Sequence, residues 1–210
     1  MWKKYFFRPL FCFAIILFIT PYLFALDMGM SVTGEYNATQ KADGKFRNKN
    51  SDWRSGYNMG ANFVLDTMID KNQLFNYRFG LGYQNVINDV SHRDMVLHRI
   101  MWTNTIGIGI IRQENFRFWI GPQIAMSMDF SGHDKETPGP SRRHDHHGNS
   151  IMGYIGPVAG LNITPINNFS FIFEIGGRAG YGASLNNLEH HMTKLEPFAN
   201  IGFLYRVGQN

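Results

Sequence analysis

The sequence predicts an all-β fold, namely an eight-stranded antiparallel up-and-down transmembrane β-barrel preceded by an N-terminal signal-peptide helix. Three observations support this prediction. Apolar and polar residues alternate with a period of two in eight segments, all charged residues of those segments lie on one face, and short and long breaks alternate between the segments. A period of two is typical of β-strands because successive side chains point to opposite faces.

The composition narrows the class of protein before any segment is considered. The chain has 210 residues, of which 15% are aromatic and 17% are charged. That balance argues against intrinsic disorder, which requires few aromatic residues and many charges, and the length suits one domain. The single cysteine, Cys12, excludes a disulfide framework and a cysteine-based zinc site.

Residues 1–25 have the pattern of a secretory signal peptide. A basic start is followed by an uncharged apolar run over residues 10–26, with the small Ala25 at the expected cleavage site. An uncleaved anchor helix is the alternative, but the run is at the short end for spanning a bilayer. Three of the 20 basic residues lie in this segment, so the predicted barrel domain, residues 26–210, is nearly neutral with its 16 acidic residues. A nucleic-acid partner is therefore not expected.

The eight alternating segments span residues 27–38, 57–66, 75–84, 99–110, 116–130, 151–163, 169–181 and 194–207. In the first four segments one face is large and apolar. Those faces carry Met28, Met30, Val32 and Tyr36; Tyr57, Met59 and Phe63; Phe75, Tyr77, Phe79, Leu81 and Tyr83; and Ile100, Trp102, Ile106, Ile108 and Ile110.

The last four segments repeat the pattern, and the fifth is the most regular. Their apolar faces carry Phe116, Phe118, Ile120, Ile124, Met126 and Met128; Ile155, Pro157, Ala159, Leu161 and Ile163; Phe169, Phe171, Phe173, Ile175 and Tyr181; and Leu195, Pro197, Ala199, Ile201, Phe203 and Tyr205. The sixth segment holds apolar residues on both faces, and we assign its faces by analogy between its Gly-Pro pair and that of the fifth.

The charged face decides between a soluble and a membrane barrel. A soluble barrel would bury its large apolar face, and eight strands leave too little room for so many aromatic side chains. Turning the apolar face to lipid and the charges to the lumen removes the conflict and gives the pattern of a transmembrane barrel. The predicted lumen charge network comprises Glu35, Asp66, Arg78, Arg99, Arg117, Asp129, Glu174, Arg178, Glu196 and Arg206, with Asp27 and Lys194 on the same face.

The breaks and the strand ends agree with this orientation. Breaks after the second, fourth and sixth segments are short, and those after the first, third, fifth and seventh are longer, as for periplasmic turns and outer loops. Aromatic residues gather at the segment ends, as interfacial girdles do. We expect Phe75 and Phe203 at the periplasmic rim, and Trp102 and Tyr181 at the outer rim.

The pattern resembles the small eight-stranded outer-membrane barrels of the outer membrane protein A, X and W type, over nearly the whole mature chain. The resemblance implies an outer-membrane location, contact with outer-membrane lipid, and insertion by the barrel assembly machinery. Such proteins usually end on an aromatic residue that this machinery reads. In this chain either Tyr205 takes that role or the recognition differs.

We expect the lumen to be largely plugged, because an eight-stranded barrel is just wide enough for its own side chains. Glu174 and Arg178 lie ~13 Å apart along one strand, so each must pair with a neighbouring strand. The expected role is structural, or surface binding through the outer loops, with lipopolysaccharide or host surface ligands as possible partners. A narrow channel for small or hydrophobic solutes is the alternative.

One outer loop is rich in histidine. His133, His144, His146 and His147 carry ligand types suited to zinc, copper or nickel, although no spacing matches a structured site and a solvated polar loop is the simpler interpretation. We expect no cofactor.

A lipid-modifying outer-membrane enzyme is the second alternative function. Ser184, Glu189 and His190, or Ser91 and His92, supply the residue types of a catalytic site. Neither set has a recognisable spacing, and the sequence therefore predicts no enzymatic activity.

Overall fold

The computed structural model of the protein describes residues 26–42, 53–67, 73–90, 93–131, 149–185 and 191–207. Within these residues the chain forms eight strands, and no helix there is long and apolar enough to cross a membrane. The predicted signal peptide lies outside the described residues. The strands are β1 (Leu26–Ala42), β2 (Arg54–Asp66), β3 (Phe75–Val90), β4 (Arg93–Arg112), β5 (Phe116–Ser131), β6 (Ser150–Ile166), β7 (Phe169–Ser184) and β8 (His191–Val207).

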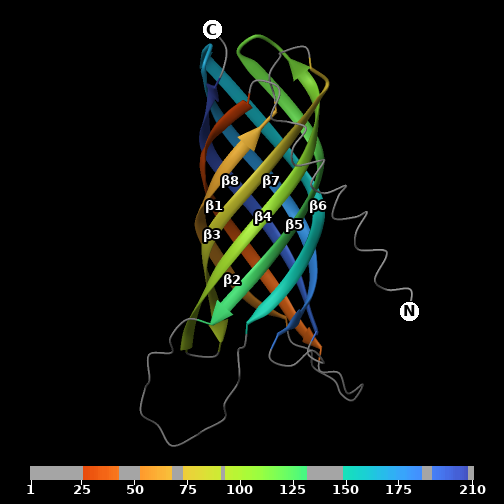
Figure 1. Cartoon of the computed structure of the whole chain (residues 1–210). Coiled ribbons are helices and arrows are strands. Elements are labelled where there is room, and N and C mark those ends of the chain that lie inside the picture. The colour runs from red at the N-terminus through yellow and green to blue at the C-terminus, as the bar shows by residue number, and fades with distance from the viewer. Residues whose placement is uncertain are drawn as a thin grey trace, which may run out of the picture.

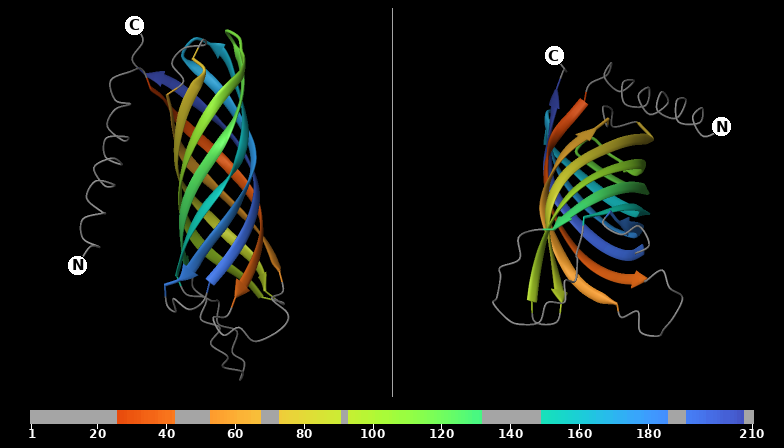
Figure 2. Two further views of the ribbon diagram at one scale, coloured as in Figure 1. Left: turned by 90° about the vertical axis from the view of Figure 1, so that its right-hand side faces the viewer. Right: turned by 60° about the horizontal axis from the view of Figure 1, so that its bottom comes forward.

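Each strand pairs with its neighbours in antiparallel orientation, and the sheet closes on itself. Closure is made by β1 and β8, which pair from Leu26 opposite Val207 to Ala42 opposite His191. The strands run obliquely around one barrel (Figures 1 and 2). The predicted eight-stranded antiparallel up-and-down barrel is therefore confirmed.

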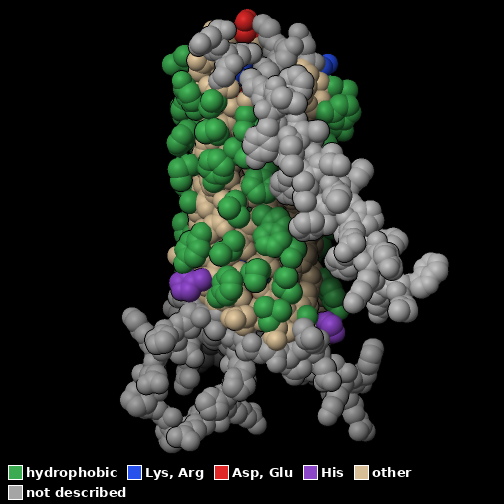
Figure 3. All heavy atoms as spheres, in the orientation of Figure 1, with side chains coloured by type: hydrophobic (Ala, Val, Ile, Leu, Met, Phe, Trp, Pro, Cys, Tyr) green, Lys and Arg blue, Asp and Glu red, His purple; other side chains and the backbone are tan. Residues whose placement is uncertain are grey.

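The barrel turns its large apolar side chains outward, as the alternation predicts. Ile124 and Ile201 are each 60% exposed, and Phe171 is 45% exposed. On the face drawn in Figure 3, hydrophobic side chains cover the wall between the two ends, whereas the coloured acidic and basic side chains lie at one end. Closure also gives every strand a partner on both sides, which a hydrocarbon environment requires.

The two ends of the barrel differ in their connections. At the end that we call the turn end, Asn167 and Asn168 alone separate β6 from β7, and residues 113–115 separate β4 from β5. The opposite end, which we call the loop end, carries the breaks 132–149 and 185–190. The short breaks predicted after the fourth and sixth strands thus lie together at the turn end.

The third break is shorter than predicted, because β3 and β4 extend beyond the alternating segments. β3 continues to Val90 and β4 begins at Arg93. The pattern reverses in this extension, where Val86 is fully buried and Asn85 is exposed. The extension also places Trp102 in the middle of β4 rather than near its end, so its position at the outer rim of the membrane stays a prediction.

Three outward-facing prolines interrupt the hydrogen-bonded ladder of the wall. Pro122 and Pro157 lie opposite each other on β5 and β6. Within the described strands, no ladder pair joins Pro122 to β4, Pro157 to β7 or Pro197 to β1. Proline has no N–H, so each of these residues removes one donor from the wall.

Candidate functional site

The lumen holds a balanced set of ionisable side chains. Six carboxylates and six basic groups from the described strands face the interior, and all but Arg206 are buried. Buried charges are tolerated only when they are paired and hydrogen-bonded. The acids are Asp27, Glu35, Asp66, Asp129, Glu174 and Glu196, and the bases are Arg78, Arg99, Arg117, Arg178, Lys194 and Arg206.

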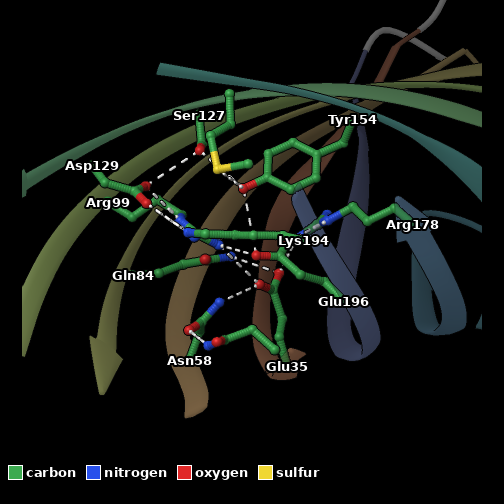
Figure 4. A network of polar contacts seen from close by, with 12 residues as sticks. Glu35, Asn58, Gln84, Arg99, Ser127, Asp129, Tyr154, Arg178, Lys194 and Glu196 are labelled. Atoms are coloured by element: carbon green, nitrogen blue, oxygen red, sulfur yellow. Dashed lines mark hydrogen bonds and ion pairs between the residues drawn. The ribbon is translucent and has the colours of Figure 1, made fainter. Parts of the chain in front are cut away.

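A loop-end cluster is built around two arginines, Arg99 on β4 and Arg178 on β7 (Figure 4). Both reach Glu196 on β8, with Arg99 Nη1 at 2.9 Å from Oε1 and Arg178 Nε at 3.1 Å from Oε2. Both also pair with Glu35 on β1, Arg99 at 3.5 Å and Arg178 through a close contact of its Nη2 with Oε1. Because β4 and β8 lie on opposite sides of an eight-membered ring, the contact of Arg99 with Glu196 crosses the lumen.

Asp129 on β5 extends the loop-end cluster and balances its charge. Its carboxylate accepts from Arg99 Nε at 2.7 Å and from Lys194 Nζ at 3.0 Å. The cluster then contains three carboxylates and three cations. It consists of Glu35, Arg99, Asp129, Arg178, Lys194 and Glu196.

Neutral amides complete the coordination of Glu35. Asn58 Nδ2 donates to Oε2 and Gln84 Nε2 donates to Oε1, each at 2.9 Å. Asn58 in turn accepts from Asn37 Nδ2 at 2.8 Å. These contacts satisfy both oxygens of a carboxylate that is buried in the lumen.

Tyr154 on β6 belongs to the same cluster, although the sequence did not single it out. Its hydroxyl donates to Glu196 Oε1 at 3.4 Å and lies 3.3 Å from Ser127 Oγ. Its ring faces the Arg178 guanidinium, 5.3 Å from the ring centroid, and Arg99 at 6.0 Å. The apolar residues on both faces of the sixth segment were the available signal that something large points inward there.

A turn-end cluster is built around Arg78 on β3. Its Nε donates to Asp66 Oδ2 at 2.8 Å, and its Nη1 makes a close ion pair with Glu174 on β7. The guanidinium lies over the fully buried ring of Trp119, 4.9 Å from the centroid. Trp119 Nε1 donates to Asn162 at 3.1 Å. Since β3 and β7 are also opposite strands, this cluster crosses the lumen a second time.

Arg117 and Arg206 lie closer to the turn end and differ in their partners. Arg117 Nη1 donates to the backbone oxygen of Gln73 at 2.8 Å, and its Nη2 donates to Asn76 Oδ1 at 3.4 Å. These hydrogen-bond acceptors are neutral oxygens, unlike the carboxylates predicted for the lumen arginines. Arg206 pairs with Asp27 at 3.0 Å where β1 and β8 close the barrel.

Large lumen side chains fit because glycines on the next strand leave room for them. A Cβ at Gly160 on β6 would come within 2.1 Å of the Trp119 ring, and one at Gly180 on β7 would come within 2.4 Å of the Tyr154 ring. The space left by these inward glycines is therefore occupied by aromatic rings that fill the lumen.

A polar cavity remains between the two clusters. Its volume is about 20 Å³, and Glu35, Gln84, Glu174, Arg178 and Asn200 are among the side chains that line it. A cavity needs a volume of about 10–15 Å³ to hold one water molecule. This cavity thus has room for about one water molecule.

The remaining sequence candidates are not brought into a site by the described residues. The loop histidines (His133, His144, His146 and His147) and Ser91, His92, Glu189 and His190 lie outside the described residues. Ser184 is the last residue of β7. Among the side chains that are described, no group of three potential metal ligands gathers.

An inverted eight-stranded barrel with an apolar wall and a charged interior defines the class of small outer-membrane barrels. The outer membrane protein OprG from Pseudomonas aeruginosa is similar to this chain, with a TM-score of 0.51 and 8% identity over 89% of this chain and 98% of that one. At this identity the similarity extends to the fold alone.

Two further solved structures are similar at lower TM-scores. Neisserial surface protein A has a TM-score of 0.43 and 13% identity, covering 82% of this chain and 96% of that one. The outer membrane protease OmpT from Escherichia coli has a TM-score of 0.42 and 7% identity, and the match covers 87% of this chain and 96% of that one. No family model and no curated protein sequence matches the chain.

Proposed function

We propose that this chain is an outer-membrane protein with a closed lumen, whose role is structural or depends on binding at its loop end. The observation that carries the proposal is the pair of charge clusters across the barrel. Arg78 reaches Glu174 on the opposite strand, and Arg99 reaches Glu196 on the strand opposite its own. A continuous water-filled path would have to break both crossings.

The outer-membrane location is supported by the wall of the barrel. Mid-strand residues such as Ile124, Ile175 and Ile201 are 60% to 66% exposed, which water does not favour over so large an area. We expect the protein to be recovered from the outer membrane only with detergent, and to migrate faster on a gel before heating than after.

A closed lumen leaves the ends of the barrel as the places where a soluble partner can meet the protein. The loop end carries the longer breaks, including residues 132–149. Binding there to lipopolysaccharide or to a host surface ligand is the role that we propose. Capture of labelled lipopolysaccharide by the refolded protein, compared with a variant shortened within 132–148, tests the first of these partners.

Conductance tests the closed lumen directly. Protein refolded into a planar bilayer should show no unitary current steps, whereas a general porin handled identically should show them. Stable openings of general-porin size would contradict the proposal.

A narrow channel is the second candidate, and the mid-lumen cavity is the observation that favours it. A space with room for a water molecule, lined by Arg78 and Arg178, would be one step on such a path. Uptake of small neutral solutes into liposomes, without ionic current, would favour this function over the first.

A further inference from the structure

Each charge cluster holds one amide side chain whose oxygen is left free. Gln84 Nε2 donates to Glu35 in the loop-end cluster at 2.9 Å, and Asn200 Nδ2 donates to Glu174 in the turn-end cluster at 2.7 Å. A carboxylate only accepts hydrogen bonds, so the nitrogen of each amide must face its carboxylate. Gln84 Oε1 and Asn200 Oδ1 are then buried with no hydrogen-bond partner among the described residues.

These two free oxygens belong to side chains that line the same cavity. Gln84 and Asn200 both border the cavity between the clusters, and Gln84 is only 1% exposed. An unpaired buried carbonyl oxygen is unfavourable, and the cavity of about 20 Å³ has room for a water molecule.

The lining determines which ligand the cavity favours. Glu35 and Glu174 are balanced by Arg78 and Arg178, so the net charge around the cavity gives no preference for an ion. Both carboxylates already accept from arginines and amides. The buried atoms of the lining that have no partner are the two amide oxygens, Gln84 Oε1 and Asn200 Oδ1, which call for a small neutral donor.

We infer that the cavity binds a water molecule that donates to Gln84 Oε1 and to Asn200 Oδ1. Water has two protons for these two acceptors. Thr105 also lines the cavity, and its Oγ1 accepts from Gln123 Nε2 at 3.0 Å, which leaves its hydroxyl proton free to donate.

Such a water joins the two clusters into one network from β1 to β7. The path runs from Glu35 through Gln84 to the water, and then through Asn200 to Glu174. The inference does not rest on the proposed function, because a barrel that conducts could hold the same water. Conductance and hydration are therefore separate tests.

Water itself is the probe, detected by NMR on the full barrel refolded in micelles. Cross-peaks between water and the side-chain amide protons of Gln84 and Asn200 should appear, with the opposite signs in NOESY and ROESY spectra that mark a bound water rather than proton exchange. Absence of both cross-peaks from the folded wild-type protein would overturn the inference.

Two variants locate the water. Gln84→Met should abolish the water cross-peak at Asn200, because it removes one of the two acceptors. Gln123→Met is the matched control, since this amide lines the cavity but its oxygen already accepts from Arg178 at 3.4 Å. Retention of the Asn200 cross-peak in Gln84→Met, or its equal loss in folded Gln123→Met, would contradict a water held between these two oxygens.

Discussion

Arg99 holds the loop-end cluster together because it contacts three carboxylates at once. It lies within 3.5 Å of Glu35, Asp129 and Glu196 and is fully buried. Removing one partner from such a cluster leaves uncompensated charge away from water, which is far more costly than losing an exposed ion pair.

Arg99→Met should therefore lower the free energy of unfolding by about 3–5 kcal/mol. Arg206→Met is the comparison, because Arg206 is 17% exposed and pairs with Asp27 at the barrel end. This variant should lose less stability. Urea unfolding of the two variants in lipid vesicles checks this order, and equal losses would contradict it.

Gly160 tests how tightly the lumen is packed. A methyl group there meets the Trp119 ring at 2.1 Å, and the buried ring has little space into which to move. Gly160→Ala should cost about 1–3 kcal/mol of stability. Gly153→Ala should cost much less, because nothing lies within 4 Å of a Cβ at that position. Thermal unfolding of both variants distinguishes a packed lumen from a loose one.

The direction of each charged side chain could be predicted from the sequence, but its partner could not. Alternation places Glu174 and Arg178 on the inner face. The prediction that each pairs with a neighbouring strand is confirmed for Arg178, which pairs with Glu196 on β8. It is wrong for Glu174, which pairs with Arg78 on the opposite strand β3. Which strands meet across the lumen depends on register and tilt, which a period of two does not specify. The partners of Arg117 could not be predicted either, because they are a backbone oxygen and an amide oxygen.

At the level of the strands, alternation predicts the structure where the wall faces an apolar medium. β5 follows the alternation: Ile120 and Ile124 are exposed on the outer face, and Gln123 between them is buried on the inner face. The alternation fails in the extension of β3, where Asn85 points outward and Val86 inward. An outer face that meets water need not be apolar. A strand there lacks the alternation of apolar and polar residues from which strands are predicted.

A charged residue introduced into the outer wall should destabilise the barrel more in the middle of the membrane than near its edge. Ile124 lies in the middle of β5, whereas Ile166 is the last residue of β6 at the turn end. Ile124→Arg should destabilise the barrel by about 2–4 kcal/mol and Ile166→Arg by about 0–1 kcal/mol. Both side chains are exposed, so a soluble barrel would show no difference between the two variants.

At the scale of the whole molecule, the barrel separates two kinds of surface. Among the described residues, six carboxylates and six basic groups are balanced inside, and most large apolar side chains lie outside, with Trp119 and Phe198 as inward exceptions. The two clusters cross the lumen between opposite strands, and the closed lumen that we propose directs function toward the loop end and away from bulk transport. The number of strands, the closure of the barrel and its outward apolar face were predictable from the sequence. The cavity and the packing of lumen rings against glycines were not, because they depend on how the side chains fit in three dimensions.

The most direct test is to ask what medium touches the middle of the wall. In a Cys12→Ser background, spin labels at Ile124→Cys and Ile201→Cys should be accessible to oxygen and shielded from a water-soluble nickel complex after refolding into lipid bilayers. A label at Glu114→Cys at the turn end should show the reverse. Nickel access at Ile124 and Ile201 equal to that at Glu114 would contradict an apolar wall that faces lipid.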